Sequence, residues 1–206
     1  MLFRSWEEHW VAMKRIIELD LGKQVYGRYN TNLSRVAFAG CNLFSDILVN
    51  LRDWQVCASI DGTGRIGEYI RTGLKWEDWL KNFKQGLKYT KHRRQLMLDY
   101  TVTLPGLFEA KRMFDLSQEL NVRLLTKITF AFGSDIAMSP LFLPRHILEP
   151  IVKDILDYAK PKATPFQQPF IDVFENLLTR KTFEEEYLDY EQGQVRGKQR
   201  ILKLEQ

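Results

Sequence analysis

Residues 95–104 read QLMLDYTVTL, and apolar and polar side chains alternate along them. From Leu98 onward every second residue is large and apolar, and Asp99, Thr101 and Thr103 lie between these positions. A period of two places successive side chains on opposite faces of an extended chain. The segment therefore predicts a β-strand with one apolar face and one polar face.

Strands and helices alternate on both sides of this segment. Residues 25–32, 55–61 and 122–132 predict three more strands. Residues 76–87 and 107–120 predict amphipathic helices between them, because their apolar side chains recur on one helical face. This order predicts an α/β fold with about four parallel strands, joined by right-handed crossovers.

Local signals predict where several elements begin and end. Residues 5–21 predict a first amphipathic helix, and Gly22 is expected to take the left-handed position after it. Asn121 is expected to end the helix at 107–120. Ser45 and Asp46 predict the start of a short helix, and Thr182 with Glu185 forms a capping-box pattern. The segment AKPKATPFQQP is the best linker candidate. It predicts an α/β domain over 1–160, then a linker and a helical, polar tail over 161–206.

One face of the predicted sheet is unusually polar. Its side chains are Arg28, Asn30, Asn32, Ser59, Asp61, Asp99, Thr101, Thr103, Lys127 and Thr129. Such a face does not suit the packed interior of a closed eight-stranded barrel. It suits an open, incomplete (β/α) barrel with helices on the outer face and a polar ligand near the carboxyl ends of the strands. The alternative is a sheet face covered only by water.

Composition excludes several classes of protein. The chain has 206 residues, of which 45% are hydrophobic and 27% charged, as in ordinary globular domains. Two cysteines exclude a disulfide framework and a metal centre built from three or four thiolates of this chain. A net charge of +4 makes nucleic acid an unlikely partner. Without a long apolar run or a signal-peptide core, the chain is expected to be soluble and cytoplasmic, with no membrane partner.

Residues 59–85, SIDGTGRIGEYIRTGLKWEDWLKNFKQ, resemble the radical S-adenosylmethionine (SAM) superfamily, most closely its twitch-domain and SPASM-like members. YNTN at 29–32 and DYTVTLPGLFEAKRMFDL at 99–116 match in the same order, and LLTKITFAF and LPRHILEPIVKDIL follow. The resemblance covers roughly residues 1–160. It implies a radical SAM-type barrel that uses SAM and a 4Fe–4S cluster to make a 5′-deoxyadenosyl radical.

The chain departs from that family where the cluster is bound. It contains neither the Cys-x3-Cys-x2-Cys segment nor the Gly-Gly-Glu-Pro turn of the family. Its opening residues resemble the family sequence that follows that turn. Cys41 and Cys57 have the wrong spacing to replace the three cysteines. The chain therefore looks like a member without its first two strands. We expect no metal site and no activity from it alone.

The resemblance also implies roles for individual residues. Ser59 and Asp61 would contact SAM, Asn30 and Asn32 would bind the ligand at the next strand end, and Arg71 would clamp a carboxylate. Each has a structural alternative. Asp61 could cap the following glycine turn, the two asparagines could form a turn, and Arg71 could pair with Glu68.

The remaining polar residues of this face are candidates for the substrate side of the site. They are Asp99, Thr101, Thr103 and Lys127. The alternative for them is a hydrated network with no ligand. An unrelated α/β-barrel enzyme with acid–base chemistry on Asp61, Asp99 and Lys127 is a further possibility.

Two readings of function remain open. The chain is either the SAM- and substrate-binding part of a radical SAM-type enzyme whose cluster comes from elsewhere, or a non-catalytic descendant that binds a small molecule or a protein. Either way, the strand at 25–32 becomes a sheet edge, and an uncovered edge invites pairing. We expect self-association or a partner chain that supplies strands.

Overall fold

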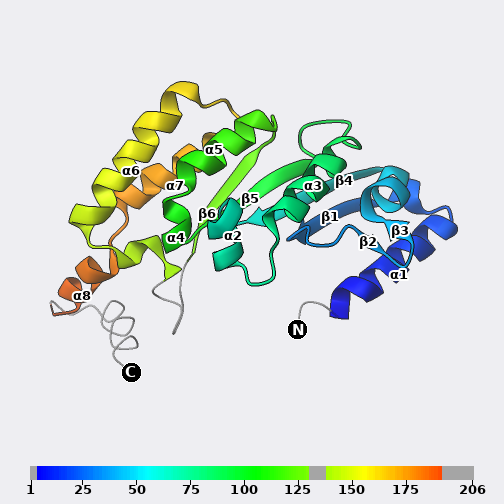
Figure 1. Cartoon of the computed structure of the whole chain (residues 1–206), viewed down its shortest axis with the longest axis horizontal. Coiled ribbons are helices and arrows are strands. Elements are labelled where there is room, and N and C mark those ends of the chain that lie inside the picture. The colour runs from blue at the N-terminus through cyan, green and yellow to red at the C-terminus, as the bar shows by residue number, and fades with distance from the viewer. Residues whose placement is uncertain (1–3, 130–137, 192–206) are drawn as a thin grey trace. The chain divides into compact units, whose positions relative to one another are not determined.

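The computed structural model describes residues 4–129 and 138–191 (Figure 1). Four strands form a parallel sheet in the order β1-β4-β5-β6, and β2 and β3 form a separate antiparallel pair. The sheet strands are β1 (Tyr26–Thr31), β4 (Asp53–Ile60), β5 (Leu96–Val102) and β6 (Leu124–Ile128). The predicted α/β class with about four parallel strands is confirmed. The last three residues of the predicted strand 122–132 lie outside the described residues.

The chain divides into two compact units. Unit 1 comprises residues 1–59 and 74–98, and unit 2 comprises residues 60–73 and 99–206. The divisions fall within β4 and β5, so each unit holds part of the sheet. The domain boundary predicted at residue 160 stays a prediction.

Unit 1 carries the first two sheet strands. Its other elements are α1 (Arg4–Glu18), β2 (Ala37–Phe38), β3 (Cys41–Asn42), α3 (Trp76–Leu87) and short helical turns at Gly22–Gln24, Leu43–Ile47 and Leu48–Asn50. The parallel register sets Tyr29 beside Val56 and Asn30 beside Cys57. Residues at matching positions of neighbouring strands share a face, so the predicted division of β1 and β4 into two faces is confirmed.

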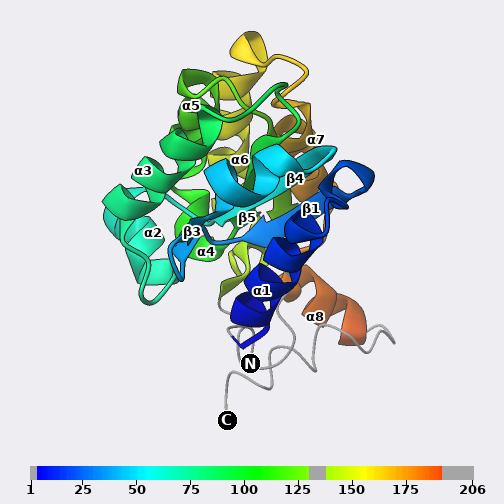
Figure 2. The same cartoon turned by 90° about the vertical axis from the view of Figure 1, so that its right-hand side faces the viewer.

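The core of unit 1 is aromatic. Trp79 and Phe83 of α3 are fully buried, and their rings stack with centroids 5.1 Å apart. Phe44 lies in the turn Leu43–Ile47 and packs on Trp54 of β4. The helix α1 contacts the same turn (Figure 2). These contacts explain why the apolar face predicted for residues 76–87 lies inward.

Unit 2 is mainly helical. Its helices are α2 (Gly64–Ile70), α4 (Leu104–Leu107), α5 (Ala110–Glu119), α6 (Arg145–Ala159), α7 (Gln168–Thr179) and α8 (Phe183–Glu191), with turns at Pro140–Phe142 and Lys160–Lys162. The helix α7 packs against β6, and α6 contacts both α5 and α7. Phe170 of α7 stacks on Tyr100 of β5 and packs at a tilt against Phe174. The apolar face of β5 is therefore covered by α7.

Two local predictions need correction, and one helix was not predicted. The segment Gly64–Ile70 forms a helix, although its two glycines gave no helical signal. The single helix predicted over 107–120 is two, α4 and α5, which meet at Phe108 and Glu109. The short helix predicted to begin at Ser45 and Asp46 begins earlier, because the Asn42 side chain accepts hydrogen bonds from the Phe44 and Ser45 amides.

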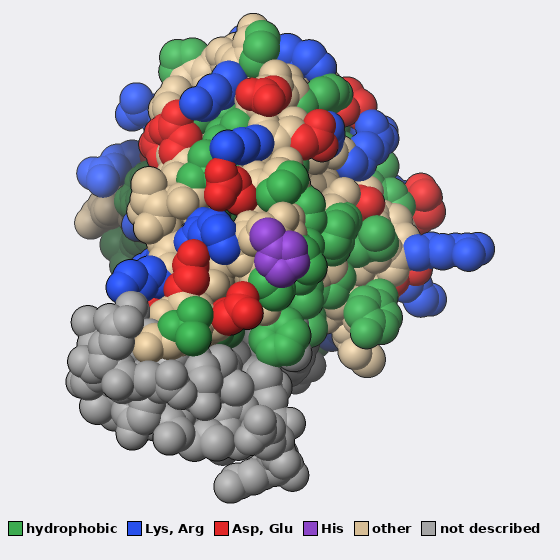
Figure 3. All heavy atoms as spheres, turned by 90° about the vertical axis from the view of Figure 1, so that its left-hand side faces the viewer, with side chains coloured by type: hydrophobic (Ala, Val, Ile, Leu, Met, Phe, Trp, Pro, Cys, Tyr) green, Lys and Arg blue, Asp and Glu red, His purple; other side chains and the backbone are tan. Residues whose placement is uncertain are grey.

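Large apolar side chains also lie on the surface of unit 2. The exposed ones are Tyr69, Phe108, Phe142, Ile147 and Leu188. Figure 3 shows that hydrophobic side chains gather on one face of the molecule. Exposed apolar side chains are common on globular proteins.

Candidate functional site

Polar residues meet in unit 2 at the carboxyl ends of the strands. The Thr129 amide donates to the Val102 carbonyl, which sets Thr129 beside Thr103 and Lys127 beside Thr101. The Val56 amide donates to the Gln95 carbonyl, and the register it sets brings Asp61 beside Thr101. Asp61, Thr101 and Lys127 therefore occupy one row across three neighbouring chain segments.

Asp61 and Arg71 form a two-pronged ion pair. The Arg71 Nε lies 2.7 Å from Asp61 Oδ2, and Nη2 donates to Oδ1 at 3.1 Å. Asp61 is only 6% exposed, whereas Arg71, directly after α2, is half-buried. A forked guanidinium–carboxylate contact is both strong and directional. The sequence singled out both residues but did not predict that they bind each other.

The loop that carries Asp61 is held by the segment after β5. Glu109 Oε2 accepts from the Thr63 amide at 3.1 Å and also from the Thr63 hydroxyl. Gly106 passes so close to this loop that a Cβ built on it would lie 2.5 Å from the Asp61 carbonyl oxygen. Only a residue without a side chain fits there. The position of Asp61 therefore depends on α4.

Thr103 has a structural role at the start of α4. Its Oγ1 accepts a hydrogen bond from the Gly106 amide at 3.0 Å, which caps the helix. Tyr100 supports the same turn by donating to the Gly106 carbonyl at 2.6 Å. Burial raises the pKa of Tyr100 well above its usual range, and the charges of Glu109 and Asp61 add to that rise. The substrate-binding role predicted for Thr103 stays a prediction.

Asp99 and Lys127 form a second ion pair on the polar face. Lys127 Nζ lies 2.7 Å from Asp99 Oδ2. The Asp99 side chain is 12% exposed and that of Lys127 is 53% exposed. The lysine therefore reaches solvent while its partner is shielded. Thr101, beside Lys127 and two residues after Asp99 on the same strand, is half-buried. This places three of the four predicted substrate-side residues together.

The predicted residues of unit 1 lie in other settings. Asn32 Oδ1 accepts from the Ser34 amide at 3.1 Å and from the Ser34 hydroxyl at 2.8 Å, which is the turn geometry expected as its alternative. Asn30 is exposed and Ser59 is half-buried. Their ligand-binding roles stay predictions.

The cysteines do not fit an iron–sulfur cluster. Cys41 lies in β3 and is half-buried, whereas Cys57 lies in β4 and is buried; both are free thiols. Burial and the nearby Asp46 charge raise the pKa of Cys41, which disfavours the thiolate form that ligates metals. Within 4–129 and 138–191, no group of three or more His, Cys, Asp or Glu residues could hold a metal ion.

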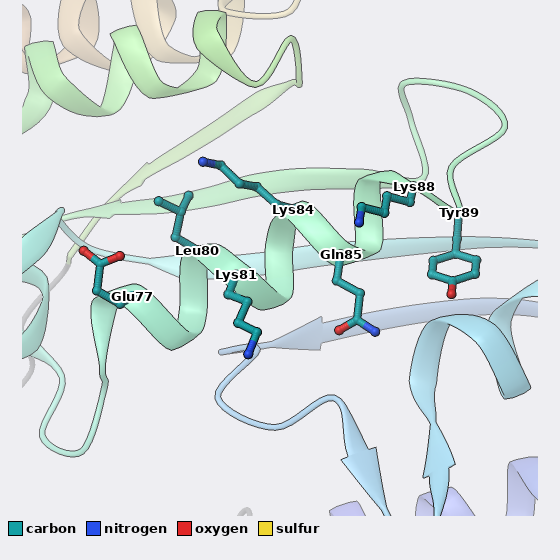
Figure 4. A pocket seen from close by; sticks show the side chains of 7 residues that line it. All are labelled: Glu77, Leu80, Lys81, Lys84, Gln85, Lys88 and Tyr89. Carbon is teal, nitrogen blue, oxygen red and sulfur yellow. The ribbon is translucent and has the colours of Figure 1, made fainter.

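A hollow on α3 was not predicted. Its volume is about 620 Å³ and it belongs to unit 1 (Figure 4). The residues that line it are Glu77, Leu80, Lys81, Lys84, Gln85, Lys88 and Tyr89. The helical period of the three lysines was visible in the sequence, but the depth of the hollow was not.

Comparison with known proteins adds no family. No protein-family model, no curated protein and no solved structure matches the chain. Among the described helices, none is long and apolar enough to cross a membrane. The radical SAM resemblance, the cytoplasmic location and the partner chain stay predictions.

Proposed function

We propose that this chain is the ligand-binding part of a radical SAM-type enzyme, shaped as an incomplete barrel, and that SAM binds at the carboxyl ends of β4, β5 and β6. The observation that carries the proposal is the row of Asp61, Thr101 and Lys127 in unit 2, with Arg71 forked onto Asp61. Parallel α/β sheets bind their ligands at this edge. Two of the residues to which the resemblance gives a role in SAM binding, Asp61 and Arg71, are in this cluster.

The donors and acceptors of this row suit the groups of SAM. The Asp61 carboxylate has lone pairs beyond those that Arg71 uses, so it can accept from ribose hydroxyls. Arg71 has five N–H donors; one on Nη2 is donated to Asp61, and Nε lies against the same carboxylate. The others suit the carboxylate of the methionyl group. The exposed ammonium of Lys127 and the Thr101 hydroxyl remain for a substrate.

No step of the radical chemistry is assigned to this chain. The cluster would supply the electron that cleaves SAM, and the two cysteines do not fit it. We therefore expect the chain alone, even with iron and sulfide, to form no 5′-deoxyadenosine. The same cysteine placement supports a second candidate, a non-catalytic descendant that binds SAM or a related molecule without cleaving it.

Isothermal titration calorimetry with SAM tests the proposed site. We expect saturable binding to the whole chain, and a loss of at least tenfold in affinity in R71Q and in D61N, because each change removes one partner of the fork. The matched controls are R65Q on the same helix and D157N on α6, both at exposed positions. The controls should bind SAM like the unaltered chain.

Each result has a clear reading. Equal SAM affinity in R71Q, D61N and the controls would show that SAM does not bind at the proposed site. Absence of SAM binding by the unaltered chain would contradict the proposed function. If D61N fails to fold, the variant R71K replaces it in the test, because lysine keeps the positive charge but cannot make the forked contact with Asp61. Cleavage of SAM only when a cysteine-rich partner chain is added would favour the enzyme over the non-catalytic descendant.

A further inference from the structure

The hollow on α3 is lined by three lysines at helical spacing. Lys81, Lys84 and Lys88 lie at i, i+3 and i+7, and such residues are neighbours along one side of a helix. In the view of Figure 4, Lys81 and Gln85 reach to one side of the helix and Lys84 to the other, and Lys88 lies near the carboxyl end of the helix. The volume of the hollow, about 620 Å³, is that of a small-ligand site.

The charge around this hollow is mainly positive. Residues 79–98 contain no Asp or Glu, and their six basic residues are Lys81, Lys84, Lys88, Lys91, Arg93 and Arg94. In the described part of the chain, none of the three lysines of the hollow forms an ion pair with an acidic side chain. Glu77, at the first turn of α3, is the one acid in the lining. The hollow is therefore a positively charged depression that attracts an anion.

An aromatic ring closes the carboxyl end of the hollow. Tyr89 follows α3 directly, is half-buried, and stacks on Phe44 with ring centroids 6.4 Å apart and planes 7° apart. This support holds the ring in one orientation. Figure 4 shows the ring extending to the same side of the helix as Lys81 and Gln85. A fixed aromatic ring beside a row of lysines matches the way in which proteins bind single-stranded nucleic acid.

We propose that the α3 hollow binds single-stranded nucleic acid, with phosphates on Lys81, Lys84 and Lys88 and a base against Tyr89. The net charge of +4 gave no argument for such a partner. The net charge, however, does not show that basic residues are concentrated at this hollow. An acidic peptide would also meet the lysines, yet it need not carry a planar ring to stack on the tyrosine. The proposal rests on unit 1 alone and is independent of SAM binding.

Salt dependence measures how many lysines contact phosphate. Fluorescence anisotropy of a labelled oligothymidylate is followed with the whole chain over a series of NaCl concentrations. Three phosphate contacts to a single strand give a slope of about −2 in log K against log salt. We expect this slope, and we expect each Lys→Gln change in the hollow to reduce its magnitude by about 0.7.

Matched variants separate the hollow from overall charge. The triple variant K81Q/K84Q/K88Q should abolish measurable binding, and Y89L should weaken it about tenfold, as expected for a lost stacking contact. The control K111Q/K153Q/K160Q removes the same charge from lysines of unit 2 that are paired with Asp154, Glu149 and Glu175. It should keep the binding and the slope. Circular dichroism checks that every variant is folded.

Several outcomes would overturn the proposal. The first is absence of oligothymidylate binding at low salt, and the second is equal loss in the two triple variants, which would mean attraction to net charge alone. The third is displacement of the oligonucleotide by polyglutamate at equal charge concentration, which would assign the hollow to an acidic protein partner.

Discussion

Because Gly106 has no side chain, its backbone can approach the segment that carries Asp61. Its backbone passes against the Asp61 carbonyl, its amide donates to Thr103, and its carbonyl accepts from Tyr100. One residue therefore joins the end of β4 to the first turn of α4. Because Asp61 holds Arg71 from this position, a shift at Gly106 should reach the fork.

The variant G106A tests this connection. The new methyl group would lie 2.5 Å from the Asp61 carbonyl oxygen and 2.8 Å from Thr103 Oγ1, so backbone must move. We expect the free energy of unfolding in urea to fall by about 1–3 kcal/mol and SAM binding to weaken. G73A is the control, because its Cβ meets nothing within 4 Å but its φ of +87° is unfavourable for alanine. It should lower stability and leave SAM affinity unchanged; equal SAM affinity in G106A would contradict the connection.

Elements with strong local signals were predicted well. The helix predicted at 76–87 is α3 with the same bounds. Asn121, predicted to end a helix, has a φ of +53°. The predicted capping box exists, since the Thr182 amide donates to Glu185 at 2.8 Å and the Glu185 amide donates to Thr182 Oγ1 at 3.3 Å. These features depend on a few adjacent residues, so sequence alone determines them.

Elements fixed by distant contacts were predicted poorly. The left-handed residue after the first helix is Asp20, with a φ of +56°, and not Gly22. Gly22 is needed elsewhere, because a Cβ there would lie 2.5 Å from the Asn50 carbonyl oxygen, 28 residues along the chain. The helix α2 lacks a local signal for a related reason. Arg71, which follows the carboxyl end of α2, is held by Asp61, and a contact of this kind leaves no periodic pattern in the sequence.

The start of α8 should make the protein sensitive to acid. Arg145 forks onto Glu185, with Nε and Nη2 within 3.0 Å of its two oxygens, and also donates to the carbonyls of Leu177, Leu178 and Arg180. The fork, together with the hydrogen bonds from Thr182, lowers the pKa of Glu185 from 4.5 to about 2. The helix α8 is thereby tied to α6 and to the end of α7.

A carboxylate with a lowered pKa stabilises the fold only while it is ionised. The contribution of Glu185 is complete above its unfolded pKa of about 4.5 and is lost as the pH falls toward 2. The side chain is 33% exposed, so solvent screening reduces its contribution to the free energy of unfolding to about 1–2 kcal/mol. We expect E185Q to be less stable than the unaltered chain at pH 6 and to approach it at pH 3. Urea unfolding at both pH values measures this. E184Q, at an exposed neighbour, should show no such convergence, and a constant difference for E185Q would contradict the assignment.

At the scale of the whole molecule, the alternation of side chains predicted the sheet and its polar face but not the site itself. Asp61, Asp99 and Lys127 were placed correctly on polar positions, because a period of two needs no tertiary contact. Their pairing could not be predicted. The choice of Arg71 for Asp61 and of Lys127 for Asp99 depends on how strands and helices come together.

The four-stranded sheet should also decide how the chain associates. In the described residues, β1 has a neighbouring strand on one side only, β4. Four strands are too few to close a barrel, so this edge keeps unpaired backbone groups. Tyr26, at the start of β1, is 47% exposed and adds apolar surface. We expect this edge to pair with another strand, from a second copy of the chain or from a partner.

Sedimentation velocity over a range of protein concentrations tests this association. We expect the unaltered chain to form dimers or larger species as concentration rises. Y26K should shift the distribution toward monomer, because a lysine on an edge strand opposes pairing. V11K makes a comparable change at an exposed position of α1 and should leave the distribution as it was. Equal effects of the two variants would place the contact on α1, and a monomer at every concentration would mean that β1 does not recruit a second strand.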